Sequence, residues 1–219
     1  MQKKALYVMR RALLLFGGAS FLCGCVRDNR DDCLFPLRLQ FSYTYNREGR
    51  DLFSAEVEQV RLYLFDSRSG ELKASTVARS KDLGPDNTFT WNVAPGSYHA
   101  VAWGCSEGER YRVLSSERFP QSRLSVQTLS DGSSVEQKPE HLWYEIGRGL
   151  TVTGELQAPH PMDLHKLSND VRVEVSGLRD EQFPRLSCTI SASNGTYDFE
   201  GRTRDENPCL LYTSPSPRD

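Results

Sequence analysis

Apolar and polar residues alternate along much of this chain, and the alternation predicts β-strands. The longest such run is Leu37–Tyr45, nine residues with apolar or aromatic side chains at every odd position. One face of such a strand is buried and the other is solvated. The shorter alternating runs have their apolar positions at Val60, Leu62 and Leu64; Phe89, Trp91 and Val93; Leu142, Tyr144 and Ile146; Val171, Val173 and Val175; Leu186, Cys188 and Ile190; and Tyr197 and Phe199.

Turn residues separate these runs. Asp66–Gly70 (DSRSG) predicts a reversal of the chain, and Pro95-Gly96 predicts a second break. The run that follows, Tyr98–Trp103 (YHAVAW), is almost continuously apolar, which is typical of a strand covered on both faces. No segment shows a convincing 3.6-residue period. Short strands separated by turns indicate an all-β sandwich fold.

The length of the chain, 219 residues, allows one large or two small domains. We expect an N-terminal β-sandwich domain over residues 37–147. New strand material begins near Leu150, so residues 148–208 are expected to form part of a second β-sandwich domain. Its strand pattern stops unfinished, and half a sandwich exposes an apolar face, so this part is expected to fold poorly alone.

The last residues, 209–219 (CLLYTSPSPRD), differ from the rest of the chain in pattern. They contain two Ser-Pro pairs and no alternation, and they resemble a translated sequencing adapter. We therefore expect this tail to be non-native. The alternative is a genuine disordered C-terminus.

A leader occupies residues 1–24. Lys3, Lys4, Arg10 and Arg11 form a positive region, and an apolar run follows at 12–22. This run is far shorter than the roughly 20 residues that span a bilayer, so it predicts a signal peptide.

The leader ends in Leu22-Cys23-Gly24-Cys25, which resembles a bacterial lipobox. In that chemistry the thiol of Cys25 takes a diacylglyceryl group, and cleavage after Gly24 makes Cys25 the acylated N-terminus. Residues 25–36 would then be a polar, lipidated leash. Acidic residues just behind a lipidated cysteine resemble the signal that sends Bacteroidetes lipoproteins to the outer face of the outer membrane. We therefore expect a lipid-anchored, surface-exposed protein.

Four of the six cysteines remain after the leader and the lipid site are set aside: Cys33, Cys105, Cys188 and Cys209. An exported protein can form disulfides. Cys33 with Cys105 is our first choice, because both flank strands of the first domain. The sequence leaves the other pairings open.

Composition and motifs favour a binding or structural protein over an enzyme. The formal net charge is −2, whereas nucleic-acid binders usually carry a basic stripe, so no nucleic-acid partner is expected. The four histidines match no metal-ligand spacing, and neither a G-x-S-x-G elbow nor a C-x-x-C pair follows Cys25. We expect no metal, no cofactor and no catalytic site. Trp143 and Tyr144 could instead stack on sugar rings, which leaves a surface glycan- or solute-binding lipoprotein as an alternative.

Several motifs occur in an order that resembles one known family. The lipobox and the acidic leash precede DCLFP, and the later motifs are FSYTYN, LYLFD, PGSYHAVAWG (95–104) and HLWYEIG (141–147). This order is similar to that of the FimB/Mfa-type fimbrial anchor lipoproteins of Bacteroidales, within the fimbrillin superfamily. The resemblance extends from Cys25 to about Glu206, and the segment 95–104 is its most specific part.

The resemblance implies tandem transthyretin-like β-sandwich domains, of which the second is truncated here. It also implies an anchor that holds the base of a surface fimbria on the outer membrane and limits its length. The expected partners are fimbrial shaft or accessory subunits, joined by β-strand complementation, in which an extended segment of one subunit completes the sheet of another.

Overall fold

The computed structural model describes residues 33–106, 110–127, 139–177 and 195–204. The predicted signal peptide, the lipobox with Cys25, the predicted strand at 186–190 and the predicted non-native tail lie outside the described residues. The residues from Leu34 onward belong to one compact unit, and the predicted all-β fold class is confirmed. Its elements are β1 Phe35–Ser42, α2 Phe53–Glu56, β2 Gln59–Asp66, β3 Leu72–Arg79, β4 Thr88–Val93, β5 Gly96–Cys105, β6 Tyr111–Ser115, β7 Arg123–Val126, β8 Leu142–Val152, β9 His160–Asp163, β10 His165–Lys166 and β11 Thr196–Asp198.

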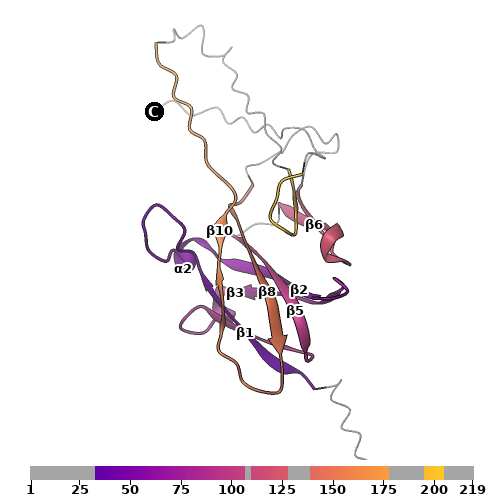
Figure 1. The fold of residues 1–219 in the computed structure, drawn as a ribbon. Coiled ribbons are helices and arrows are strands. Elements are labelled where there is room, and N and C mark those ends of the chain that lie inside the picture. The colour runs from indigo at the N-terminus through magenta and orange to yellow at the C-terminus, as the bar shows by residue number, and fades with distance from the viewer. Residues whose placement is uncertain (1–32, 107–109, 128–138, 178–194, 205–219) are drawn as a thin grey trace, which may run out of the picture. The chain divides into compact units, whose positions relative to one another are not determined.

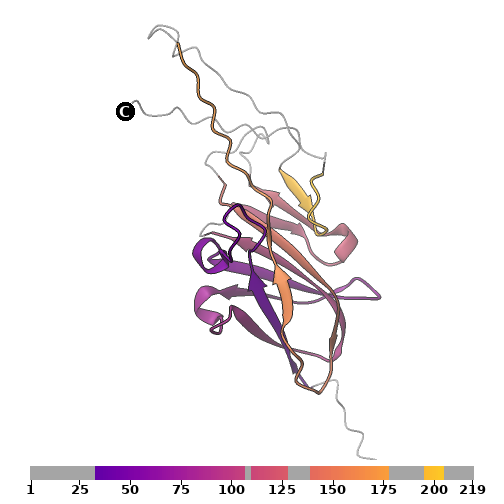
Figure 2. The same ribbon diagram turned by 60° about the vertical axis from the view of Figure 1, so that its left-hand side comes forward.

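Three sheets form the described part of the chain (Figures 1 and 2). The central sheet has five strands in the order β10-β8-β5-β2-β3. A second sheet, β4-β1-β9, packs on one of its faces, and in it β1 is antiparallel to β4 and parallel to β9. The third sheet, β11-β7-β6, packs on the opposite face. The central sheet is therefore covered on both sides.

Two apolar cores follow from this arrangement. The inner core lies between the central sheet and the β4-β1-β9 sheet, and its largest buried side chains are Leu39, Phe41, Phe53, Leu62, Leu64, Trp143 and Met162. The aromatic core lies beneath the third sheet and contains Phe65, Val101, Trp103, Tyr111, Leu124, Val126, Leu142, Tyr144, Tyr197 and Phe199. Strand β5 contributes to both cores, which confirms the prediction that its apolar run is buried on both faces.

Strand β1 is shorter than its alternation predicts. Its apolar face is buried in the inner core as expected, but the strand ends at Ser42. Beyond it, the Tyr43 N–H donates to the Asp51 carboxylate and the Tyr43 carbonyl accepts from the Asn46 side chain, so the chain turns away. Tyr45, the last residue of the predicted strand, is 77% exposed.

Strand β8 passes through the domain boundary that we predicted after residue 147. It pairs with β5 from Leu142, opposite Cys105, to Val152, opposite Gly96. The register shifts near His99, and Gly149 takes a φ of +67° there, a conformation that glycine adopts readily. β9 then pairs with β1, and β10 pairs with β8. The predicted boundary therefore lies inside a strand, and the first sandwich continues to the end of β10.

Residues assigned to the second domain have two different environments. Tyr197 and Phe199 are buried in the aromatic core, where β11 pairs with β7. Val171, Val173 and Val175 form no strand within the described residues and are 49–64% exposed. The existence of a complete second sandwich therefore stays a prediction.

Candidate functional site

Trp143 and Tyr144, the residues considered for stacking on sugar rings, are buried, whereas Trp91 is partly buried. Trp103 and Trp143 are each 1% exposed, and Tyr144 is 9% exposed. Trp143 meets Tyr43 edge to face, and the Tyr144 hydroxyl donates to the Phe199 carbonyl. Their ring faces are packed in the cores, so neither ring is available for the sugar stacking that the sequence left open as an alternative.

The two cysteines of the predicted disulfide are free in the structure. Cys33 is exposed, and Cys105 is buried at the end of β5. Cys105 pairs with Gln59 and Leu142. The structure contains no bond between Cys33 and Cys105, and their pairing stays a prediction. Burial raises the pKa of the Cys105 thiol, which disfavours the reactive thiolate.

The described residues contain neither a metal-ligand cluster nor a membrane-spanning helix. Among them, no group of three or more histidine, cysteine, aspartate or glutamate side chains could hold a metal ion. None of the helices in the described ranges is long and apolar enough to span a membrane. Within the described ranges, the terminal strands of each sheet have no strand neighbour on their outer side, and such edges can pair with another chain.

The first of these edges is a groove beside β1. β9 pairs with β1 only from Leu39 to Ser42, so the first half of β1 faces the second half of β8 across a cavity of about 270 Å³. The Ser42 carbonyl accepts from Leu164 N–H on this side, so by alternation Arg38 and Pro36 also direct their backbone groups into the groove. Pro36 has no N–H to donate. The connecting residues 155–161 line the same groove.

A carboxylate fastens the other half of β1 to β9. Asp163 Oδ1 accepts from the Thr44 N–H at 2.9 Å and from the Ser42 hydroxyl at 3.1 Å, and its Oδ2 accepts from the Thr44 hydroxyl. Burial opposes ionisation of Asp163, but the hydrogen bonds from Thr44 and Ser42 outweigh it and hold the pKa of this carboxyl below its ordinary value. The ionised side chain of Asp163 therefore links β9 to the last residue of β1 and to Thr44 just beyond it.

We expect Asp163→Ala to lower the free energy of unfolding at pH 7 by about 1–2 kcal/mol, because it leaves the Thr44 N–H without its acceptor. A depressed pKa contributes stability above the unfolded-state pKa of about 4, and this contribution is lost as the pH falls through the folded-state pKa. The gap between the wild type and Asp163→Ala in urea unfolding should thus shrink below about pH 4. Asp86→Ala, at an exposed aspartate, is the control, and a gap that is constant with pH would contradict the prediction.

Two further edges are protected by side chains. On β3, the Leu72 N–H donates to the Glu117 carbonyl, and the Arg79 N–H donates to the Asp82 carboxylate, so both ends are occupied. Charged Lys73 and Arg79 flank its middle. On β6, the Tyr111 carbonyl accepts from Arg61 Nη1 at 2.7 Å. Charged side chains and occupied backbone groups are ways in which proteins discourage pairing at edges.

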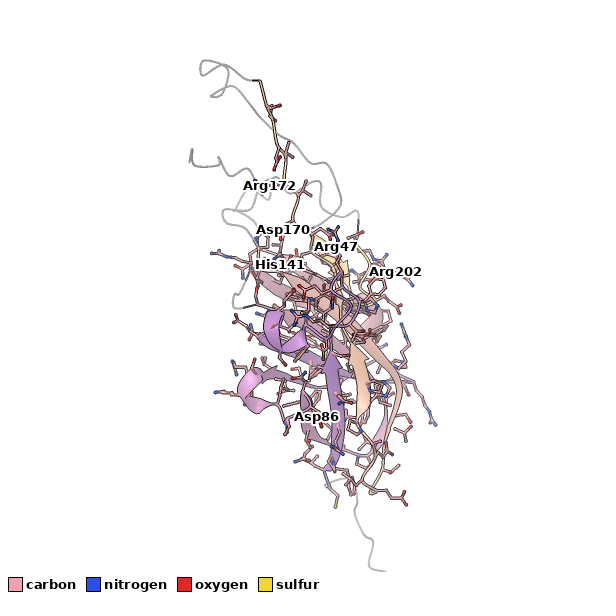
Figure 3. The ribbon with its side chains drawn as sticks, turned by 90° about the vertical axis from the view of Figure 1, so that its left-hand side faces the viewer. Arg47, Asp86, His141, Asp170, Arg172 and Arg202 are labelled. Atoms are coloured by element: carbon pink, nitrogen blue, oxygen red, sulfur yellow. The ribbon has the colours of Figure 1, made fainter. Side chains whose placement is uncertain are left out.

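The chain leaves β10 at a polar junction. The Ser168 hydroxyl accepts from the Leu142 N–H at 3.0 Å, which ties the exit to the start of β8. Figure 3 shows His141 beside Asp170, and their Nε2 and Oδ2 atoms are 3.3 Å apart. Figure 1 shows β1 beginning at the lower end of the molecule, whereas the chain leaves β10 at the upper end.

Comparison with solved structures first shows which proteins share this fold. The fimbrial anchor protein Mfa2 from Porphyromonas gingivalis superposes with a TM-score of 0.65 at 19% identity, covering 81% of this chain and 66% of that one. A candidate polysaccharide-binding protein from Bacteroides thetaiotaomicron gives 0.60 at 19% identity, covering 81% and 64%. A candidate adhesin from Bacteroides ovatus gives 0.59 at 19%, covering 80% and 61%. At these identities the likeness shows a shared fold.

The sequence itself then identifies the family. Residues 30–215 match the family model of the fimbrillin-A associated anchor proteins Mfa1 and Mfa2, and the chain belongs to this family. The resemblance read from the sequence motifs is thereby confirmed. No curated protein matches the chain, and it spans 61–66% of the length of the solved structures compared above. Family membership supports a fimbria-associated role at the cell envelope.

Proposed function

We propose that this protein anchors the base of a surface fimbria to the outer membrane and limits the length of that fimbria. The observation that carries the proposal is the match of residues 30–215 to a family of fimbrial anchor proteins. The lipobox-like sequence Leu22–Cys25 supplies the means of attachment, because it directs a lipid to Cys25. Shaft or accessory subunits of the fimbria are the proposed partners.

The lipid makes the attachment lasting. Each buried methylene contributes about 0.8 kcal/mol, and a single acyl chain gives only marginal binding. A bacterial lipoprotein carries two or three chains, so its release from the membrane is negligible. A subunit fixed in this way cannot move along a growing polymer, and it therefore marks the end of that polymer.

Strand complementation is the proposed mode of joining. The described sheets end in strands that have no strand neighbour on their outer side within the described residues, and an extended segment of another subunit can pair along such an edge. Backbone hydrogen bonds supply affinity in this mode, and alternating side chains set the register.

We expect Cys25→Ala to release fimbriae from the cells into the medium, because the acceptor thiol for the lipid is lost. Cys23→Ala is the matched control, since it changes the neighbouring cysteine and leaves the thiol of Cys25 in place. Shed fimbriae are measured in the culture supernatant, and the protein is followed between membrane and soluble fractions. Unchanged retention of fimbriae in Cys25→Ala cells would refute the anchor function.

A further inference from the structure

We infer that the outer edge of β4, Thr88–Val93, is where an extended strand of a fimbrial subunit pairs with this protein. This inference rests on the proposed function and specifies the surface that carries it out. β4 is the terminal strand of the β4-β1-β9 sheet, and no described strand pairs with its outer side.

Hydrogen bonding to β1 fixes which backbone groups of β4 face outward. The Phe41 N–H donates to the Asn87 carbonyl, and the same register pairs Leu39 with Phe89. In an antiparallel ladder, hydrogen-bonded and non-hydrogen-bonded pairs alternate. Phe89 and Trp91 therefore direct their backbone groups toward β1, while Thr90 and Asn92 direct theirs away from it.

The direction of the outer groups has independent support at the start of the strand. The Gly84 N–H donates to the Thr88 carbonyl, which lies on the side away from β1, as the alternation requires. This bond occupies the first outward carbonyl. The N–H and C=O groups of Thr90 and Asn92 remain available to a partner strand.

The chemistry of β4 distinguishes it from the other edges. The first half of β1 contains Pro36, β9 contains Pro161, and β3 is flanked by charged side chains. Strands β10 and β11 have two and three residues. β4 has six residues (TFTWNV) with neither proline nor charge, and its threonines, aromatics and valine favour strands. Among the described edge strands longer than three residues, β4 is the one with neither a proline nor a charged side chain, which are features that discourage pairing at an edge.

The side chains of β4 determine which residue types a partner strand must have. Phe89 and Trp91 pack against the rim of the inner core but are only partly buried. A strand added beside β4 would place every second side chain next to these rings. Apolar residues at those positions would cover Phe89 and Trp91, while the intervening residues would lie beside Thr90 and Asn92 on the outer face. The partner is therefore an extended segment with alternating apolar and polar residues.

Thr90→Pro tests the edge directly. It removes an outward N–H and places a ring at the edge, yet leaves the hydrogen bonds between β4 and β1 in place, and proline is tolerated on the free side of an edge strand. Ser75→Pro is the matched control on β3. The Ser80 N–H donates to the Glu58 carbonyl, just before the neighbouring strand β2, so by the same alternation the backbone groups of Ser75 point away from β2. Both full-length proteins must show the wild-type melting temperature. If Thr90→Pro does not, Thr90→Lys serves instead, as a charge on the same edge.

The probe is fimbriae purified from cells in which the gene for this protein is deleted, added to the purified lipoprotein. We expect Thr90→Pro to weaken cosedimentation with these fimbriae by at least about tenfold, and Ser75→Pro to leave it unchanged. Amide hydrogen exchange gives a second readout. Thr90 and Asn92 should become protected when fimbriae bind, Phe89 and Trp91 should already be protected, and Ser75 and Val77 should not change.

Three results would overturn the inference: wild-type binding by Thr90→Pro, equal loss in Ser75→Pro, or protection at Thr90 and Asn92 caused by a second copy of this protein without fimbriae. The proposed anchor function is tested by a separate experiment. Cells carrying Cys25→Ala that retain their fimbriae would remove the anchor role, while protection of Thr90 and Asn92 by isolated fimbriae would still support the edge.

Discussion

Replacing Trp103 with alanine is expected to lower the free energy of unfolding by about 3–5 kcal/mol, the range for deleting a buried aromatic side chain. The Trp103 ring centroid lies 4.9 Å from that of Tyr144, 5.8 Å from that of Phe199 and 6.2 Å from that of Tyr197. The central sheet contributes Trp103 and Tyr144, whereas the other two belong to or follow β11. The indole therefore fills the space between two sheets, and its loss leaves a large cavity.

Urea unfolding followed by far-UV circular dichroism measures the effect of Trp103→Ala. Trp103→Phe is the control, and it should cost clearly less, because it keeps an aromatic ring and removes an indole N–H that has no hydrogen-bond partner among the described residues. Amide exchange should also show earlier opening of β11 in Trp103→Ala. A loss of less than about 1 kcal/mol would mean that the third sheet does not depend on this ring.

Phe41→Ala is expected to have an effect of similar size, about 3–5 kcal/mol, in the inner core. Phe41 is 1% exposed, and its ring stacks on that of Phe53 with centroids 5.5 Å apart and an interplanar angle of 17°. Phe53 lies in α2, so this contact holds the short helix against β1. The substitution removes the ring on which Phe53 stacks.

Tyr45→Ala provides the comparison for Phe41→Ala, because both residues occupy apolar positions of the same alternating run. Tyr45 is 77% exposed, and its ring contacts His165 at 5.4 Å, so its loss should change the unfolding free energy by less than about 0.5 kcal/mol. Thermal melts of both variants at pH 7 are sufficient to compare them. Equal destabilisation by the two substitutions would contradict the position at which β1 ends.

The pattern of the sequence predicted the strands that have one large apolar face. β1, β2, β4 and β5 all lie where alternation or a continuous apolar run indicated them, and the reversal at Asp66–Gly70 joins β2 to β3. β3 itself went unrecognised, because its sequence LKASTVAR carries mostly small or polar side chains. An edge strand beside a wide core needs little apolar surface of its own, so periodicity gives a weak signal there.

The predicted domain boundary divided one strand into two. Alternation ends at Ile146 and new strand material begins near Leu150, whereas in the structure both stretches belong to β8 and a register shift lies between them. Tyr197 and Phe199 show a second difficulty. Their alternation correctly indicated a strand, but its partner, β7, lies more than 70 residues earlier in the chain, and sequence spacing contains no information about that pairing.

The candidate site depends on properties that alternation alone does not reveal. The sequence shows Pro36 only as a residue at the start of a strand. The register adds that its nitrogen faces an open groove. Thr90 and Ser75 are both polar strand residues, and only the hydrogen bonds at Asn87 and Ser80 establish that each faces outward. The lipobox-like sequence at residues 22–25, in contrast, lies outside the described residues, so lipidation of Cys25 stays a prediction from local sequence.

The central place of β1 in its sheet has a mechanical consequence. Figure 1 shows β1 beginning at the lower end of the molecule and the chain leaving β10 at the upper end, so tension between these two points would run along the length of β1. Such tension loads the backbone hydrogen bonds from β1 to β4 and β9 in shear, so that they must break together and not one after another. A load applied in this direction would therefore meet the combined resistance of both pairings.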